Sequence, residues 1–524
     1  MFRPRAARFS TVTVEMRHGL GPEPLEGCTD TVLAFLYASL PAPPISATAS
    51  LSCSAAAAAA GHGGVDRISA LPDEVLLHVV VRLPAKDGAR TAAVSKRWAR
   101  LWRSAPLVLV DAHLLPAGSR RPPSRRGAAS RAVRDAVSAA LRAHPGPFPF
   151  VSLTYGFMEA VAADRALLAR WFLLLATKGV EELVLVNRPS PIPGLRLPAA
   201  LFSCPSLRSL LLGAWEFPDT TLLPRGASLP NLLEIILGCV TMNDRDLDFV
   251  LAASPVLEIL AIVGSPGRLT ARLASHSLRC AQFGMTELQE VSVMDAPCLE
   301  RLIIWNPQSH IRHKRKTVTK IKIRHAPQLS TLGYLEPGEH VLEIGNTVIK
   351  AGTKASPNTV VPSVRMLAVH LQFGVSSEVK ILSSFLRCFP NVETLCVESV
   401  PTCEPTANLS HQFWQETSPI ECVQSHLKIL SFREFSGEQR ELDFLVFIAE
   451  NAPVLQRMNL VLKYGGACAT REEMGAKLRV LESAKWACGG HKMRILAHGV
   501  YGGFSLGSLK AGCNSTYNDP FICL

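Results

Sequence analysis

The sequence predicts an α+β multidomain protein in which a small three-helix bundle precedes an irregular α/β repeat solenoid. Two patterns carry this prediction: short helical periods between residues 66 and 113, and an apolar motif that recurs from residue 180 to residue 458. Of the 524 residues, 48% are hydrophobic and 19% are charged. Such a composition excludes a mainly disordered chain and can supply a large core.

Positive charge is concentrated in two regions of the chain. Residues 1–150 hold 19 Lys and Arg against 10 Asp and Glu, and residues 311–325 add seven cations and no acid. These regions carry +9 and +7 of a total of +12, so the remainder is slightly acidic at −4. A nucleic-acid binder that is basic throughout is therefore not predicted. We expect an exposed loop instead, with a basic patch at Arg312, Lys314, Arg315 and Lys316.

The 14 cysteines show no C-x-x-C spacing, and no P-loop or dinucleotide fingerprint is present. We therefore expect no bound metal and no cofactor. Several cysteines fall inside apolar runs, which is typical of buried, reduced thiols and indicates the nucleus or cytoplasm. No apolar run is long enough to cross a bilayer, so we expect no membrane partner.

Residues 1–64 read as a low-complexity N-terminal extension. The stretch ends in an alanine run to Ala60, followed by Gly61-His62-Gly63-Gly64. Composition of this kind favours a linker over a packed domain. We expect this extension to be disordered.

Residues 65–113 show a compact helical pattern. Pro72 is followed by two acids, which favours a helix start because proline needs no donor there and the helix dipole attracts negative charge. Apolar residues then recur at helical spacing as far as Pro84, and Asp87 can begin a second short helix. A third helix follows, with Trp98 and Trp102 on neighbouring turns. So small a bundle has a marginal core and needs a partner to cover its remaining apolar surface.

Four runs of residues in this segment carry a resemblance to a known family. They are Leu71-Pro72-Asp73-Glu74-Val75-Leu76, Leu83-Pro84-x-Lys86-Asp87, Val94-Ser95-Lys96-Arg97-Trp98 and Leu101-Trp102. With these runs the segment resembles the F-box, in particular its plant version. The resemblance implies docking on a Skp-type adaptor and, through it, on a cullin of a ubiquitin ligase. Gly88 departs from the alanine that the family prefers, and glycine near a helix start costs about 0.5–1 kcal/mol. The alternative role for the tryptophans is to fill the bundle core. The adaptor-binding positions that the resemblance implies are Leu71, Pro72, Val75, Leu76, Leu83, Pro84, Val94, Trp98, Leu101 and Trp102.

The larger part of the chain repeats one motif. Pro-x-φ-x-x-φ-x-φ, in which φ is apolar, occurs eight times, and three further units keep the apolar triplet without the proline. Proline belongs just ahead of a strand, and the φ-x-φ residues share one face of that strand. The central apolar positions span 275 residues in ten intervals, about 27 each, which is the period of leucine-rich repeats whose units must stack to bury their faces. Those positions are Leu183, Leu210, Ile235, Leu260, Ala281, Leu302, Leu332, Leu367, Leu395, Leu430 and Met458.

The residues within individual repeats also resemble those of a known family. Ser254-Pro255-Val256-Leu257-Glu258-x-Leu260 is similar to plant F-box leucine-rich-repeat proteins, and Leu427-Lys428-Ile429-Leu430-Ser431-Phe432 with Ala449-Glu450-Asn451-Ala452-Pro453 resembles the FBD domain that closes many of them. We therefore divide the chain into an extension (1–64), an F-box (65–113), a basic linker (114–150), a leucine-rich-repeat array (151–400), FBD-like terminal repeats (401–500) and a Gly-rich tail (501–524). Helices such as 246–251 and 379–388 are expected on the convex side.

A repeat strand also has an outward position, between its last two apolar residues, that points to the concave face. These residues are apolar in the early repeats, and we hypothesise that Leu211, Ile236 and Ile303 contact a substrate protein. The alternative is that both faces of the sheet are covered, as is usual for parallel sheets.

We therefore expect an adaptor and not an enzyme, with no catalytic residue. The G-x-S-x-G motif at residues 503–507 has no histidine after it, as a hydrolase elbow requires. The expected partners are a Skp-type adaptor, a cullin reached through it, and a protein substrate of unknown identity; nucleic acid is not an expected partner. The alternative is a basic repeat scaffold that binds nucleic acid or other polyanions, with a non-functional F-box.

Overall fold

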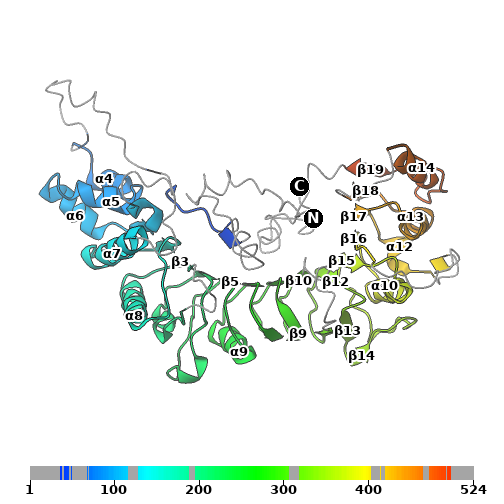
Figure 1. Cartoon of the computed structure of the whole chain (residues 1–524), viewed down its shortest axis with the longest axis horizontal. Helices are drawn as coiled ribbons and strands as arrows, with labels where there is room; N and C mark the ends of the chain where they lie inside the picture. Colours follow the sequence, from blue (N-terminus) through cyan, green and yellow to red (C-terminus); the bar gives the residue numbers. More distant parts are fainter. Residues whose placement is uncertain are drawn as a thin grey trace. The chain divides into compact units, whose positions relative to one another are not determined.

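A computed structural model describes residues 36–37, 40–46, 49, 68, 70–115, 128–187, 195–305, 318–402, 413–414, 419–463, 471–490 and 492–496 (Figure 1). The basic patch expected at residues 312–316 and the Gly-rich tail at 501–524 lie outside these residues. The chain forms two compact units: residues 1–257 with 263–267, and residues 258–262 with 268–524. No helix among the described residues is long and apolar enough to cross a membrane.

The first unit begins with the predicted three-helix bundle. It consists of α4 (Asp73–Val81), α5 (Ala85–Thr91) and α6 (Lys96–Ser104). Pro72 and Pro84 stand at the N-caps of the first two helices, and the hydroxyl of Ser95 caps the third by accepting a hydrogen bond from Trp98 N. Each helix therefore begins where a residue removes or satisfies an unpaired backbone donor.

The prediction of a linker at residues 114–150 is wrong for the second half of that range. Residues Ala128–Ala143 form α7, a helix of 16 residues. Its apolar residues recur four apart and are fully buried, so the segment packs despite its basic character. The buried residues are Val133, Val137 and Leu141. The first half, with its arginine-rich run at 120–126, lies outside the described residues.

The strands of the first unit form one parallel sheet in chain order. They are β1 (Val108–Val110), β2 (Phe150–Leu153), β3 (Glu182–Val186), β4 (Ser209–Gly213) and β5 (Glu234–Gly238). The sheet therefore starts two strands earlier than the repeat pattern predicted. The connections of this unit include η1 (Asp111–Leu114), α7, α8 (Ala162–Thr177), η2 (Ala199–Ser203), η3 (Thr220–Leu222) and α9 (Asp244–Ala253). Figure 1 shows α8 and α9 on one side of these strands.

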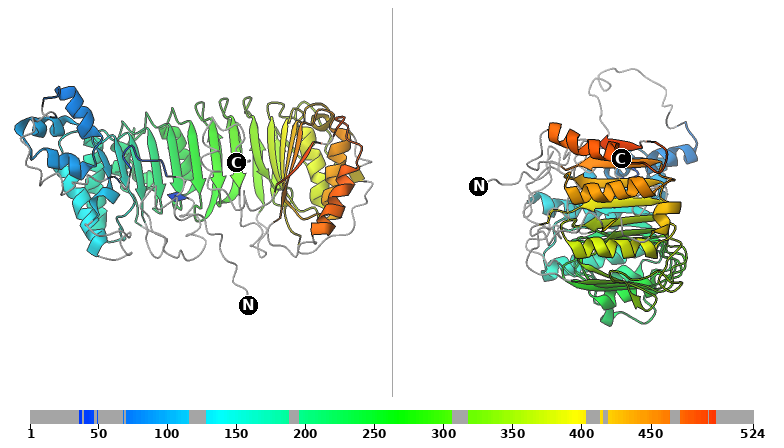
Figure 2. Two further views of the ribbon diagram at one scale, coloured as in Figure 1. Left: turned by 90° about the horizontal axis from the view of Figure 1, so that it is seen from above. Right: turned by 90° about the vertical axis from the view of Figure 1, so that its right-hand side faces the viewer.

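The second unit continues the same arrangement. Its parallel strands follow one another in the order of the chain, as their successive colours in Figure 2 show. They are β6 (Ile259–Val263), β8 (Cys280–Gly284), β10 (Arg301–Trp305), β12 (Thr331–Leu335), β15 (Met366–Leu371), β16 (Thr394–Ser399), β17 (Ile429–Phe435), β18 (Arg457–Leu462) and β19 (Met493–Leu496). The helices of this unit are α10 (Ser376–Cys388), α12 (Glu421–Ser425), α13 (Gln439–Asn451) and α14 (Arg471–Glu482).

The predicted repeat is confirmed at the level of single residues. Each of the eleven central apolar positions is the second residue of a strand, and each is at most 1% exposed. Adjacent ones pair directly across the sheet, for example Leu210 with Ile235 and Leu395 with Leu430. In each unit, direct pairing places these residues on one face of the parallel sheet, where they form the core beneath the helices.

A second sheet in the second unit was not predicted. Its order is β14 (Thr347–Val348), β13 (His340–Ile344), β11 (Thr319–Ile323), β9 (Glu287–Asp295) and β7 (Arg268–Ala274). It takes the place that helices hold in the other repeats. The sequence signal is the alternation Lys-Ile-Lys-Ile within β11, which is typical of a half-buried strand.

Four of the repeat helices begin with the same N-terminal hydrogen-bonding arrangement. The third residue of α8, α9, α10 and α13 is a buried acid whose carboxylate accepts a backbone N–H from the segment just before the helix. These bonds measure 2.8 Å from Glu159 to Asp164, 2.9 Å from Asn243 to Asp246, 3.0 Å from Gln372 to Glu378 and 3.0 Å from Ser436 to Glu441. The acid thus fixes the turn that leads from strand to helix.

The N-terminal extension is also not wholly disordered, which corrects the expectation for residues 1–64. Leu36, Tyr37, Leu40 and Ile45 are all buried. Ile45 belongs to a cluster with Val108 and Val110 of β1 and Phe150 of β2. The extension contributes these apolar side chains because a short Leu-Tyr-x-x-Leu stretch interrupts its low-complexity composition.

Candidate functional site: the F-box surface and the concave face

The F-box bundle has a small core built from α4 and α6. Leu76 and Val80 of α4 are fully buried, and Trp98 and Leu101 of α6 join them. These residues recur at helical spacing, so each helix directs one apolar stripe inward. Trp98 and Leu101 therefore stabilise the bundle, and any adaptor contact they make comes in addition.

A second apolar stripe of α4 points outward. Val75 and Val79 lie four residues apart on the solvent side, and Leu71 precedes them. Ile68 and Val94 are 58% and 71% exposed. Single exposed aliphatic residues are common, but five within 27 residues of a small bundle indicate a surface that a partner covers. We call Ile68, Leu71, Val75, Val79 and Val94 the F-box surface.

Polar contacts hold this surface in place. The Nε atom of Arg97 donates to Oδ1 of Asp73 over 2.6 Å, and its Nη2 atom donates to the carbonyl of Leu71, also over 2.6 Å. One arginine of α6 thereby fixes the first turn of α4 and the backbone next to an exposed leucine. The Asp73 carboxylate is more than half exposed, so water screens much of this pair and its main effect is on geometry.

The ten positions implied by the resemblance fall into groups in the structure. Leu76, Pro84, Trp98 and Leu101 are buried, whereas Leu83 and Trp102 are half-buried. Leu71, Pro72, Val75 and Val94 are exposed. Two further exposed aliphatic residues, Ile68 and Val79, were not among the positions that the resemblance implied. For Val79 a signal was present, because it lies one helical turn after Val75.

Trp102 connects the bundle to the segment after α7. Its ring centroid lies 5.0 Å from that of His144, which in turn lies 4.9 Å from that of Phe148. His144 places Nε2 3.0 Å from the carbonyl oxygen of Ala105, and this short distance requires a proton on Nε2. Burial lowers the pKa of His144, so the ring is neutral at pH 7. These contacts anchor the end of α6 to the first repeat.

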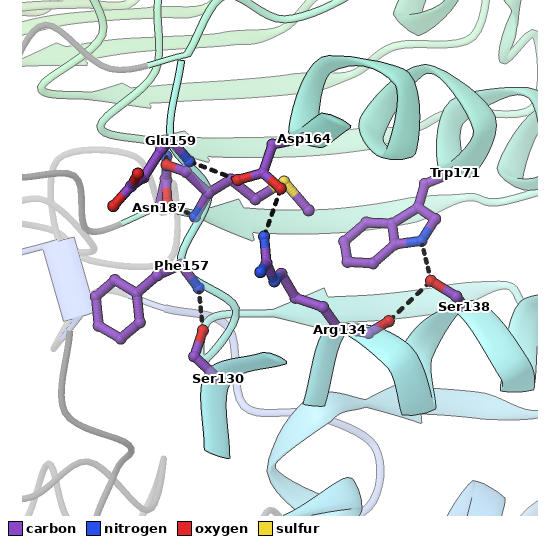
Figure 3. Close-up of polar contacts among 9 residues, drawn as sticks. Ser130, Arg134, Ser138, Phe157, Glu159, Asp164, Trp171 and Asn187 are labelled. Atoms are coloured by element: carbon purple, nitrogen blue, oxygen red, sulfur yellow. Dashed lines mark hydrogen bonds and ion pairs between the residues drawn. The ribbon is translucent and has the colours of Figure 1, made fainter. Parts of the chain in front are cut away.

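A second polar network joins α7 to α8 and the loop between β2 and α8 (Figure 3). Arg134 of α7 donates to Oδ1 of Asp164 of α8 over 2.6 Å, and both side chains are largely buried. Ser138, one turn further along α7, accepts a hydrogen bond from the indole of Trp171. The side-chain amide of Asn187 bonds both backbone groups of Met158. These bonds tie α7, α8 and the β2–α8 loop into one network.

The concave face of the first unit carries both apolar and acidic residues. Strand pairing aligns Val110, Ser152, Val184, Leu211 and Ile236 in one row across β1–β5. An adjacent row contains Glu182, Ser209 and Glu234, where the Ser209 hydroxyl donates to the Glu234 carboxylate over 3.1 Å. Partial burial raises the pKa of both glutamates, with the charge of Glu182 contributing at Glu234.

Two of the three predicted substrate residues, Leu211 and Ile236, lie in this row, and all three are buried in the structure. Leu211, Ile236 and Ile303 are 2%, 8% and 3% exposed. Leu211 and Ile236 lie next to each other on β4 and β5, whereas Ile303 belongs to the second unit. The hypothesis of a partner contact took these side chains as open to solvent, whereas their burial fits the alternative that both faces of the sheet are covered.

The second unit holds a buried charged group that sequence reasoning missed. His370 of β15 contacts the carboxylates of Glu336 and Glu398, and its ring stacks on Tyr334 with a centroid distance of 4.1 Å. Burial disfavours the charged imidazolium, but the two carboxylates outweigh it and raise the pKa of His370 to about 9. Among the described residues, no group of three or more His, Cys, Asp and Glu could hold a metal ion.

Comparison with known proteins agrees with this architecture. Residues 68–107 match the F-box-like family, residues 168–397 match the family of LRR repeats of FBD-associated F-box protein At5g56370, and residues 415–460 match the FBD family. The chain belongs to the F-box/FBD/LRR-repeat family. In the structure, the F-box match covers α4–α6, the LRR match runs from α8 to β16, and the FBD match contains α12, β17 and α13.

Relatives in this family align over most of both chains. F-box/LRR-repeat protein 13 of Arabidopsis thaliana is 26% identical over 77% of this chain and 91% of its own length. FBD-associated F-box protein At5g60610 of the same plant is 25% identical over 76% of this chain and 100% of its own length. Putative F-box/FBD/LRR-repeat protein At4g00315, also from Arabidopsis thaliana, is 25% identical over 78% and 96%.

Proposed function

We propose that this F-box/FBD/LRR-repeat protein is a non-catalytic substrate-recognition adaptor of a cullin-based ubiquitin ligase. The F-box surface docks on a Skp-type adaptor, and the repeat array binds the protein that is to be modified. The observation that carries the proposal is the outward apolar stripe of α4, Val75 and Val79, with Val94 exposed nearby in the sequence.

A solvent-exposed helix normally keeps polar residues on its outer face. α4 instead has aliphatic residues on both sides, because Leu76 and Val80 fill the core while Val75 and Val79 face solvent. Covering an exposed aliphatic side chain yields about 1.5–3 kcal/mol. Several such residues together supply the driving force for a stable contact with another protein.

The rest of the chain supports positioning and not chemistry. Trp102 of α6 packs on His144, just after α7, while Arg134, Asp164 and Trp171 fix α7 on α8 (Figure 3). Repeat arrays present long, stiff surfaces on which a protein can be held at a fixed place. In this scheme, other subunits of the ligase carry out ubiquitin transfer.

The test is a pull-down of the full chain with a purified Skp-type adaptor. We compare wild type with Val75→Glu/Val94→Glu, which changes only exposed side chains, and with the control Leu222→Glu, whose wild-type side chain is 78% exposed on η3. The proposal requires wild type and the control to bind and the double variant to lose binding. Failure of folded wild type to bind, or undiminished binding by the double variant, contradicts it.

A further inference from the structure

The concave face of the first unit is already occupied by the chain itself. Figure 1 shows the segment with residues 36–46, in dark blue, on the opposite side of the strands from α8 and α9. Leu36 and Leu40 are 0% and 2% exposed. The segment that we call the N-terminal strap, residues 36–46, has the sequence Leu-Tyr-Ala-Ser-Leu-Pro-Ala-Pro-Pro-Ile-Ser and carries no charge.

One end of the strap lies in a notch made by two glycines. A Cβ atom on Gly213 or on Gly238 would come within 2.6 Å of Cδ2 of Leu36, so a side chain at either position would displace Leu36 from its place. These glycines are paired directly across β4 and β5. They lie on the same face as Leu211 and Ile236, two residues further along each strand. The Leu36 side chain therefore packs into the space that the missing side chains of Gly213 and Gly238 leave open.

The other end of the strap lies against the edge of the sheet. Ile45 packs on Val108, Val110 and Phe150, which belong to the same face of β1 and β2. The carbonyl oxygen of Ser46 lies 2.7 Å from Nε2 of His113. The strap therefore extends over the face from β5 to β1 and covers its apolar residues.

We propose that this face is a binding groove for an extended, uncharged peptide with a leucine anchor, and that the strap occupies it as a ligand in cis. Leu36 fills the Gly213–Gly238 notch, and residues 40–46 cover the remaining apolar strip. A partner protein binds by inserting a segment of the same chemistry after the strap leaves. That this partner is a ligase substrate rests on the proposed function; the groove and its competing strap do not.

The strap is not one of the repeats and can compete with a partner for the groove. Its described residues belong to no strand of the sheet, and Leu36 and Ile45 contact the face through their side chains. A tethered ligand acts at an effective concentration in the millimolar range, so a peptide of roughly 0.1 mM affinity is weakened about tenfold by the strap. Loss of the strap is then expected to strengthen binding of such a peptide in trans by about the same factor.

The experiment uses a fluorescein-labelled peptide of residues 34–48 and fluorescence anisotropy with the full chain. Leu36→Asp/Leu40→Asp opens the groove, and it should bind the peptide about tenfold more tightly than wild type. Adding Gly238→Leu to the opened variant fills the notch and should abolish binding. Leu222→Asp, an exposed site outside the groove, should behave as wild type. A peptide with Asp in place of Leu36 should not bind any of these proteins.

A second version of the experiment does not depend on correct folding of the opened variant. A specific protease site replaces Ala55–Ala60, so the strap keeps its contacts until cleavage and can then exchange with the labelled peptide. Equal peptide binding before and after cleavage, or equal binding by wild type and the opened variant, overturns the proposal and makes the strap a permanent part of the fold. Adaptor binding by the opened variant is measured in parallel, because its loss or retention tests the ligase proposal and not the groove.

Discussion

The Nδ1 atom of His370 lies 3.0 Å from Oε1 of Glu336, while its Nε2 atom lies 3.7 Å from Oε2 of Glu398. Both contacts involve side chains with little exposure to water. On the other side of Glu336, the imidazole Nδ1 of His340 accepts a hydrogen bond from the Glu336 backbone N–H. Burial lowers the pKa of His340, so His340 is neutral while His370 carries the charge.

Stability is expected to fall above neutral pH because of His370. Its pKa in the folded state, about 9, lies above the ordinary value of 6.5. The resulting stabilisation is complete below pH 6.5 and is lost as the pH rises through 9. Thermal unfolding between pH 7 and 9.5 should show a steeper loss for wild type than for His370→Gln or Glu398→Gln. Parallel curves for the three proteins would contradict this assignment.

We expect that removing one partner of the Arg134–Asp164 pair lowers the free energy of unfolding more than removing both. Asp164→Ala leaves a buried guanidinium without its carboxylate, and removal of one partner from a buried pair costs about 3–5 kcal/mol. Arg134→Met with Asp164→Asn removes both charges and keeps an acceptor for the Glu159 N–H, so it should cost less than Asp164→Ala alone. Urea unfolding measures the three free energies. A double variant as unstable as Asp164→Ala would show that charge pairing is not the cause.

Two glycine-to-alanine changes in the first unit should have opposite signs. Gly88 lies within α5, and a Cβ there would lie 3.7 Å from Leu107, an ordinary contact. Gly88→Ala should stabilise the F-box by about 0.5–1 kcal/mol, because alanine favours helix. Gly179, after the end of α8, has φ of +61°, so Gly179→Ala should cost roughly 1 kcal/mol. Differential scanning calorimetry of both variants compares them directly, and a shift of the same sign in both would refute the explanation.

Glu441 should stabilise the FBD-like repeats by satisfying the turn before α13. Its Oε2 atom accepts hydrogen bonds from the N–H groups of Ser436 and Glu438, at 3.0 and 3.1 Å. Glu441→Ala leaves these donors unpaired at a buried site, which costs about 1–3 kcal/mol for each. Glu450→Ala, at an exposed position near the end of the same helix, should change stability by less than about 0.5 kcal/mol. Similar losses in the two variants, measured by chemical unfolding, would exclude a special role for Glu441.

The sequence predicted the repeat because one physical constraint acts on every unit. A strand residue that faces the helices must be apolar, and Leu210, Ile235 and Leu395 satisfy this constraint at a nearly regular spacing. The first F-box helix was predictable for a similar reason, since Pro72 marks a helix start that the structure reproduces. The second helix begins at Ala85, earlier than the start that Asp87 predicted, because Pro84 and not Asp87 is its N-cap.

Other features depend on contacts between distant residues and left weaker signals. Nothing local to Leu36 indicates that it fills a notch between Gly213 and Gly238, almost two hundred residues away. His370 likewise acquires its charge from acids on other segments. The burial of the concave strip could not be predicted either, because strand period gives the direction of a side chain and not what covers it.

Among the described residues, the unexpected second sheet ends at β7 on one side and at β14 on the other, and both strands disfavour pairing with another molecule. At one edge, β7 presents the exposed side chains of Arg268 and Arg272, whose charges repel an incoming strand of like kind. At the other edge, β14 is only two residues long and offers few backbone groups. A protein rich in β-structure can therefore reach high local concentration, as in a crowded cell, without these strands seeding intermolecular aggregates.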